Sequence, residues 1–127
     1  LRKINSKYRL IAEIVANLLE NAFKYSEENA QIGIFFCNSG IIVFDNGKKI
    51  SSEEGEKIFK KGYRGISSKN KEGTGVGLFL ARKLAKNIGG DLYLLENYQD
   101  IQFNEEIKNL KNNNIFYLKL PIEQLHK

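Results

Sequence analysis

The chain of 127 residues contains no methionine and no tryptophan, and it has one cysteine, one proline and one histidine. The single cysteine, Cys37, excludes an internal disulfide and fits a reducing compartment. Because Cys37 lies in an apolar run, we expect a buried structural thiol rather than a catalytic one. No apolar run reaches about 18 residues, so nothing in this sequence is expected to span a membrane. The polar start without a methionine argues against a signal peptide and suggests a fragment of something longer.

The composition predicts one folded domain over residues 1–127. Hydrophobic residues make up 42% and charged residues 28%, close to the norm for globular domains, and the length is enough to bury a core. The net charge is +5. Many of the basic residues gather in one segment, which suggests a loop that faces phosphate or an acidic partner, with a solvated surface loop as the alternative. They are Lys48, Lys49, Lys57, Lys60, Lys61, Arg64, Lys69 and Lys71.

Hydrophobic spacing predicts two long helices, the first of them over residues 6–25. Its expected apolar face is Leu10, Ile11, Ile14, Val15, Leu18, Leu19, Ala22 and Phe23. The second should follow a glycine-rich stretch, run to about Asn87 and end at Gly89-Gly90, with Val76, Leu80 and Leu84 as its main stripe and Leu78 and Ala85 beside it.

Four strands are expected over residues 32–37, 41–44, 91–96 and 115–120, the first two joined as a hairpin by the turn at 38–40. A short helix is expected around residues 53–60, inside a polar segment that should make few contacts to the core. The order of elements predicts an α+β fold with a mostly antiparallel sheet covered on one face.

Three polar features interrupt this pattern. Residues 73–78 read Gly-Thr-Gly-Val-Gly-Leu and open a helix, whose unpaired N–H groups favour a phosphate, although a loosely structured loop end is the alternative. Asn17 and Asn21 lie one helical turn apart, which indicates either a polar site or plain solvent exposure. Asp45 follows a buried strand in Asp45-Asn46-Gly47, where a turn is expected and a carboxylate that reads a ligand is possible.

In this order, these blocks resemble the catalytic ATP-binding domain of bacterial sensor histidine kinases, of the GHKL superfamily that also holds DNA gyrase, MutL and a heat-shock chaperone. The resemblance covers roughly Ser6 to Pro121. It implies a two-layer α/β sandwich of Bergerat type, whose mixed, mostly antiparallel sheet is covered by helices on one face. The matching segments are an N box at 17–26, a G1 box at 45–50, a lid at 48–72 with an F box at Phe59 and Tyr63-Arg64-Gly65, and a G2 box at 73–78.

The resemblance implies that the chain binds ATP and Mg²⁺. The Asn21 amide oxygen would bind Mg²⁺ with support from Asn17, and Lys24 would meet phosphate, so these three are the candidate catalytic residues. Asp45 would accept a hydrogen bond from the adenine amino group, and Ile50 would pack on the base. The implied nucleotide contacts are Asn21, Lys24, Tyr25, Asp45, Gly47, Ile50, Arg64, Gly73, Thr74, Gly75, Val76, Gly77 and Leu78.

The implied reaction moves the γ-phosphoryl of ATP to a histidine on a separate dimerisation domain, and the full-length kinase would act on a response regulator. The one histidine here, His126, is expected to be a tail residue, so the acceptor must lie outside this chain. We expect a cytoplasmic domain that does not contact a membrane. The positive charge permits a nucleic-acid binder as a further option, but no strand carries an aromatic and basic platform, so contact with nucleic acid is not expected.

Two alternatives remain at this point. One is an ATPase of the same superfamily, which is disfavoured because Asn17 stands where hydrolases have a glutamate base. The other is a non-catalytic nucleotide-binding or docking module, which is favoured by Lys49 in place of the second glycine of the G1 box. The connection at 97–114 is also longer than is usual in the family. The strands that normally precede the N box are nearly absent, which would leave an exposed sheet edge.

Overall fold

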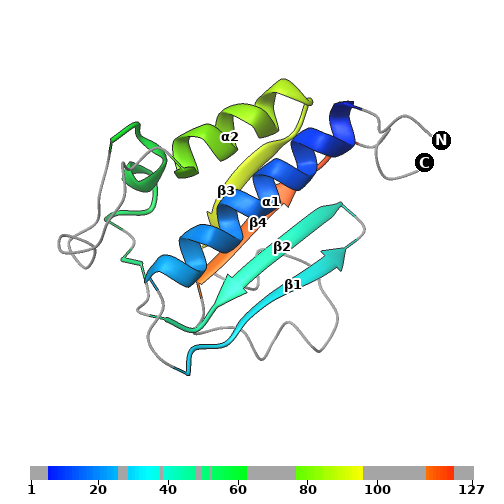
Figure 1. Cartoon of the computed structure of the whole chain (residues 1–127). Helices are drawn as coiled ribbons and strands as arrows, with labels where there is room; N and C mark the ends of the chain where they lie inside the picture. Colours follow the sequence, from blue (N-terminus) through cyan, green and yellow to red (C-terminus); the bar gives the residue numbers. More distant parts are fainter. Residues whose placement is uncertain are drawn as a thin grey trace.

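The computed structural model describes most of the chain, with side chains except at Ser6, Lys7 and Tyr25. The described residues are 6–25, 29–37, 39–47, 50–51, 53–62, 77–95 and 114–121. Helix α1 spans Ser6–Tyr25, and helix α2 spans Gly77–Asn87. Both lie against the same face of one sheet (Figure 1). Neither is long and apolar enough to cross a membrane, among the residues described.

The sheet has four strands: β1 at Ile32–Cys37, β2 at Gly40–Asp45, β3 at Asp91–Leu95 and β4 at Asn114–Lys119. Their order is β1-β2-β4-β3, and every pair is antiparallel. The predicted hairpin of β1 and β2 is confirmed, and so is the predicted sheet with helices on one face. The register places Asp45, at the end of β2, opposite Asn114, at the start of β4.

The main core lies between this sheet and the two helices. Ile14 and Leu18 of α1 are fully buried, as are Ala81 and Ala85 of α2. Apolar side chains at three- and four-residue spacing form one face of a helix, and burying that face against the sheet stabilises the helix. The sheet contributes Ile41, Val43, Leu92, Phe116 and Leu118.

The structure corrects two predicted helix faces. Phe23, placed on the apolar face of α1, is 68% exposed, and Leu80, placed on the main stripe of α2, is 38% exposed. The buried face of α2 runs instead through Ala81, Ala85 and Ile88, one helical turn apart. The predicted Ala85 is buried and Leu78 and Leu84 pack against the core, so the prediction is wrong at Leu80, where the small side chain of Ala81 takes the buried position instead. The helix ends as expected, because Gly89 takes the left-handed φ of +88° that glycine allows.

The segment after β2 also differs from its prediction. In place of a helix over residues 53–60, the chain forms turns and a short 3-10 helix, η1, at Lys57–Phe59. The expectation of few core contacts is wrong here, since Ile58 is 8% and Phe59 5% exposed within the main core. Cys37 is half-buried rather than buried, and its thiol donates to the Gly40 carbonyl at 3.3 Å.

Candidate functional site

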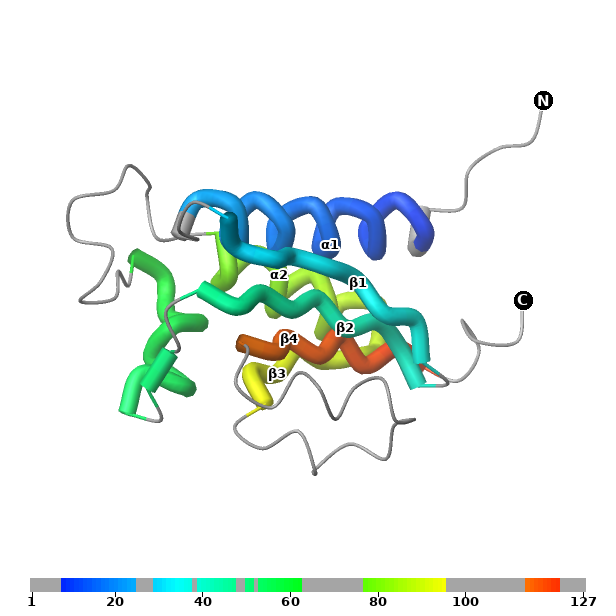
Figure 2. The backbone as a smooth tube through the Cα atoms, turned by 90° about the horizontal axis from the view of Figure 1, so that it is seen from below, coloured from blue at the N-terminus to red at the C-terminus, as the bar shows by residue number. Residues whose placement is uncertain are grey.

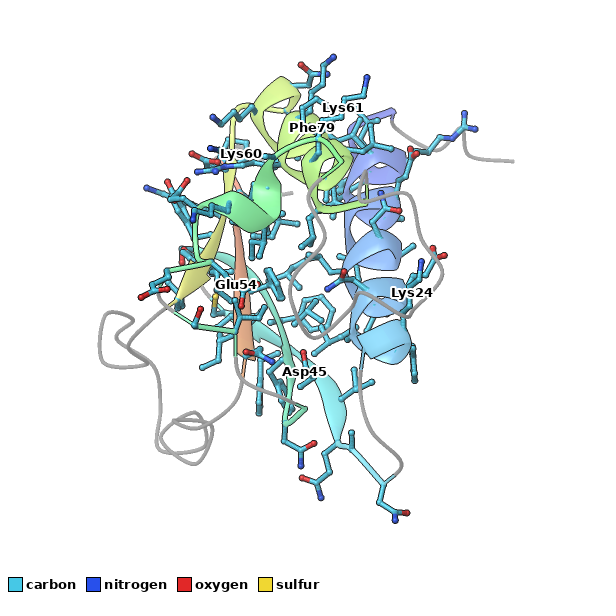
Figure 3. The ribbon with its side chains drawn as sticks, turned by 90° about the vertical axis from the view of Figure 1, so that its left-hand side faces the viewer. Lys24, Asp45, Glu54, Lys60, Lys61 and Phe79 are labelled. Atoms are coloured by element: carbon cyan, nitrogen blue, oxygen red, sulfur yellow. The ribbon has the colours of Figure 1, made fainter. Side chains whose placement is uncertain are left out.

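One end of the molecule brings together segments that are far apart in the sequence. The end of α1, the end of β2, the start of β4, η1 and the start of α2 all lie there, on the left of Figure 1 and of Figure 2. Figure 3 looks at this end and shows Lys24 on α1 and Asp45 at the end of β2. The described residues predicted from the N box, the G1 box and the start of α2 therefore occupy a common region.

Asp45 is a buried carboxylate, only 7% exposed. Its Oδ1 accepts hydrogen bonds from the Gly47 backbone N–H at 3.0 Å and from the Asn114 side-chain amide at 3.1 Å. Burial raises the pKa of Asp45, and these two hydrogen bonds only partly oppose that effect. Within the described part of the chain, Oδ2 has no hydrogen-bond partner. This carboxylate can thus accept one more hydrogen bond from a ligand.

Asn114 belongs to this site although the sequence did not single it out. It is 5% exposed, and while its amide nitrogen donates to Asp45, its oxygen accepts from the Ile50 backbone N–H at 2.8 Å. Asn114 therefore joins Asp45 to the segment that follows β2. In the sequence, Asn114 is only a polar residue directly before an apolar strand. Such a position is typical of the end of a loop, so it does not indicate a site.

Asn17, Asn21 and Lys24 lie on α1, and all three are half-buried. The Nδ2 atom of Asn17 is buried and has no hydrogen-bond partner among the described residues. A buried amide left unpaired is unfavourable by about 1–3 kcal/mol, and few such groups occur in native proteins. Asn21 lies one turn further along the same helix. The Asn17 amide nitrogen therefore has unused capacity to donate a hydrogen bond.

Three other predicted residues lie at this end. Gly77 opens α2, and a Cβ added there would meet no atom of the described residues within 4 Å. Leu78 and Ile50 pack against the main core, and the backbone of Ile50 is held by Asn114. The remaining predictions lie outside the described residues: the side chain of Tyr25, together with Lys49, Tyr63, Arg64, Gly73, Thr74, Gly75, Val76 and His126.

The site has few acidic groups for a metal. Among the described residues, no cluster of three or more His, Cys, Asp or Glu side chains could hold a metal ion. Amide oxygens remain as possible ligands. A small, hard cation such as Mg²⁺ commonly takes only one or two protein ligands and completes its shell with water and substrate phosphates. The amides of α1 fit such a cation better than an ion that needs a full protein cage.

Comparison with protein families places the site in context. Residues 6–124 match the model of the family described as histidine kinase-, DNA gyrase B-, and HSP90-like ATPase. The chain is 36% identical over 95 residues to the sensor histidine kinase Hik2 of Thermosynechococcus vestitus, which covers 71% of this chain and 25% of that protein. It is 31% identical over 102 residues to the swarming motility regulation sensor protein RssA of Serratia marcescens, covering 76% of this chain and 22% of that protein. The chain thus spans about a quarter of these two relatives, at 25% and 22% of their lengths.

Solved structures share the fold. The mycobacterial sensor histidine kinase MprB superposes with a TM-score of 0.69 at 21% identity, over 89% of this chain and 72% of that one. The catalytic domain of histidine kinase ThkA, in a nucleotide-free form, superposes with a TM-score of 0.65 at 24% identity, over 89% of this chain and 67% of that one. At these identities the likeness concerns the fold alone.

Proposed function

Because the chain belongs to the family of histidine kinase-, DNA gyrase B- and HSP90-like ATPases, we propose that it binds Mg-ATP as the catalytic domain of a sensor histidine kinase. In that role it would donate the γ-phosphoryl group to a histidine on a separate dimerisation domain. The observation that carries the proposal is Asp45, a buried carboxylate with a spare acceptor oxygen at the end of the molecule where Lys24 of α1 also lies.

Asp45 supplies the base selectivity in this proposal. Its Oδ1 is occupied by Gly47 and Asn114, so Oδ2 is left to accept a hydrogen bond from the exocyclic amino group of adenine. Guanine presents a carbonyl oxygen at the corresponding position, and two acceptors would then face each other. An unsatisfied buried acceptor costs about 1–3 kcal/mol, which corresponds to roughly tenfold to hundredfold in affinity.

The amides of α1 supply the metal end. The unpartnered Nδ2 of Asn17 supports a role for this turn in binding a polar ligand, and Asn21 offers an amide oxygen as a Mg²⁺ ligand. When bound, Mg²⁺ would neutralise the charge that develops on the phosphates. Lys24 would add a positive charge, and the N–H groups at the start of α2, with Gly73, Thr74, Gly75 and Val76 before it, would hold phosphate oxygens. Tyr25 and Arg64 stay proposed nucleotide contacts.

The residues of α1 favour transfer of the γ-phosphoryl group to a histidine over hydrolysis of ATP. A hydrolase needs a base that orients and deprotonates water. Asn17 is an amide and cannot accept that proton, and Glu20 is exposed on α1. The acceptor histidine, the dimerisation domain that carries it, a response regulator and a cytoplasmic location all belong to the proposal.

The decisive experiment titrates ATP, GTP and adenosine by calorimetry, with and without Mg²⁺. We expect wild type to prefer ATP to GTP and to bind ATP more tightly with Mg²⁺. Asn21→Ala should lose the increase in ATP affinity that Mg²⁺ causes, while its affinity for adenosine stays unchanged. Asn87→Ala, an exposed asparagine on α2, is the matched control and should behave like wild type. Equal binding of ATP and GTP, or a Mg²⁺ effect that survives in Asn21→Ala, would overturn the proposal.

A second experiment separates a kinase from a non-catalytic binding module. The chain is mixed with the dimerisation domain of its parent kinase and with ATP labelled in the γ-phosphate. Acid-labile phosphate on that domain, absent when the acceptor histidine is replaced, supports the kinase. Tight ATP binding without any phosphohistidine supports the binding module.

A further inference from the structure

Arg82 of α2 makes contacts with two other parts of the chain. Its Nη1 donates to Oε2 of Glu56 at 3.1 Å, and its Nε donates to Oδ1 of Asp91 at 3.4 Å. The guanidinium carbon also lies 4.6 Å from the ring centre of Phe59. The Arg82 side chain is only 20% exposed, so it is held along its length. One planar group therefore ties residues 56–59 to α2 and to the first residue of β3.

Two of these partners, Phe59 and Asp91, also have contacts of their own. Phe59 is 5% exposed and meets the ring of Phe116 edge-on, at 6.3 Å and 88°. The Asp91 carboxylate also accepts from the Leu92 backbone N–H at 2.8 Å. The ion pair to Glu56 is exposed at the Glu56 end, and an exposed pair alone contributes little. The stack on Phe59 and the bond to Asp91 together therefore orient the guanidinium.

The contacts of Arg82 with Glu56, Phe59 and Asp91, here called the clamp, lie next to two lysines in the chain. Lys60 and Lys61 directly follow Phe59, and both are exposed. Figure 3 shows them at the end of the molecule where α2 begins, with Phe79 of its first turn, and η1 packs against α2. Both lysines therefore lie at the same end of the molecule as the start of α2, the helix whose first turn is proposed to bind phosphate.

We propose that Arg82 is a positioning residue for the phosphate end of the nucleotide site. It acts by holding Glu56 and Phe59 on α2, and so keeps Lys60 and Lys61 beside the start of that helix. The inference rests on the proposed function and adds a residue to it. The hydrogen bonds described for Arg82 run to Glu56 and Asp91, whereas those described for Asp45 and Asn114 run to Gly47, to Ile50 and between these two residues.

Arginine is required for this geometry. A guanidinium is planar, donates in two directions at once and stacks on an aromatic ring. Lysine keeps the charge but is a compact point charge that cannot satisfy Glu56, Asp91 and Phe59 together. The substitution Arg82→Lys therefore separates the clamp from the charge.

The test compares ligands with and without phosphate. For Arg82→Lys we expect ATP and ADP affinity to fall about tenfold, the equivalent of one lost charge-assisted hydrogen bond, while adenosine affinity stays unchanged. Lys83→Ala, which removes an exposed charge from the next position of α2, is the control and should leave the ATP-to-adenosine ratio at the wild-type value. Thermal unfolding of each variant shows that it is folded at the temperature of the titration.

The outcomes are distinct. A lower melting temperature with an unchanged ATP-to-adenosine ratio means that Arg82 only stabilises the fold, and it overturns the inference. So does an equal loss for ATP and adenosine, or a Lys83→Ala variant that reproduces the phosphate-specific loss. If wild type binds neither ATP nor adenosine, or if Asp45→Asn leaves adenosine binding unchanged, the proposed function itself fails, and this inference fails with it.

Discussion

Asp45 and Asn114 face each other across β2 and β4, and the Asn114 amide donates a 3.1 Å hydrogen bond to the Asp45 carboxylate. The same side chain accepts the Ile50 N–H at 2.8 Å. One buried asparagine thus orients the carboxylate and anchors the chain that leaves β2. The fold and the candidate adenine site depend on the same pair of residues, which makes both testable by substitution.

Replacing Asn114 by alanine should lower the stability of the fold and weaken binding at the candidate adenine site. The Ile50 N–H would lose its partner and Asp45 one of its donors, and each buried group left unpaired costs about 1–3 kcal/mol. We expect the free energy of unfolding, measured by urea denaturation, to fall by at least about 1 kcal/mol, and ATP to bind more weakly. Asn87→Ala, at an exposed position of α2, should stay within about 0.5 kcal/mol of wild type. Equal stability of the two variants would contradict this reading of the pair.

Asp45 should also make stability depend on pH. Burial raises its pKa, so the folded chain holds the proton to a higher pH than the unfolded chain does. Its contribution to stability is therefore present below the ordinary pKa of aspartate, about 3.9, and is lost as the pH rises through the raised value. The variant Asp45→Asn keeps a side-chain oxygen as acceptor and carries no charge, so we expect it to be more stable than wild type at neutral pH.

The stability difference between Asp45→Asn and wild type should shrink as the pH falls toward about 4. Melting temperatures across that range measure it. Glu53→Gln, which neutralises an exposed carboxylate, is the control and should show no such trend. A difference that grows with acidity would mean that Asp45 is stabilised as an anion, against the direction of its pKa shift.

The sequence predicted those parts of the fold that have regular apolar spacing. Helix α1 and the hairpin of β1 and β2 follow their residue patterns closely, because each buries one face on the core. Asp45 could be selected for the same reason, as a charged residue at the end of a buried strand. Asn114 could not, because its partner lies 69 positions away and only the register of β2 on β4 brings the two together.

Other features depend on tertiary packing that no local pattern contains. Arg82 reads as an ordinary surface residue of a helix, and its contacts to Glu56 and Asp91 come from separate elements. Phe59 sits in a polar, lysine-rich segment, so its own surroundings in the sequence do not indicate burial; the family resemblance implies that Phe59 anchors the lid by burial, and the structure buries it. In the described sheet β1 and β3 are the two outer strands, and β1 carries Phe36 at 81% exposure; the exposed sheet edge stays a prediction.

Phe59 and Phe36 form a matched pair for comparing the stability lost at a buried phenylalanine with that lost at an exposed one. Phe59 is 5% exposed and packs on Phe116 and Arg82, whereas Phe36 is 81% exposed. Removing a buried phenylalanine leaves a cavity, so Phe59→Ala should lower the free energy of unfolding by about 3–5 kcal/mol. Phe36→Ala should change it by less than about 0.5 kcal/mol. Similar losses in urea denaturation would show that η1 is not part of the core.

Asn17 offers a test in which stability and binding move in opposite directions. Its buried Nδ2 has no hydrogen-bond partner among the described residues, so the unliganded chain carries an unsatisfied amide. Asn17→Leu removes that group and should raise the free energy of unfolding by about 1 kcal/mol or more, while ATP affinity falls because the ligand loses its polar contact. Asn21→Leu is the matched substitution one turn along α1, and it should weaken Mg²⁺-dependent ATP binding with a smaller gain in stability. Urea denaturation and calorimetric titration of both variants measure the two effects. If Asn17→Leu is destabilised and binds ATP like wild type, the amide has a structural partner and no role in binding.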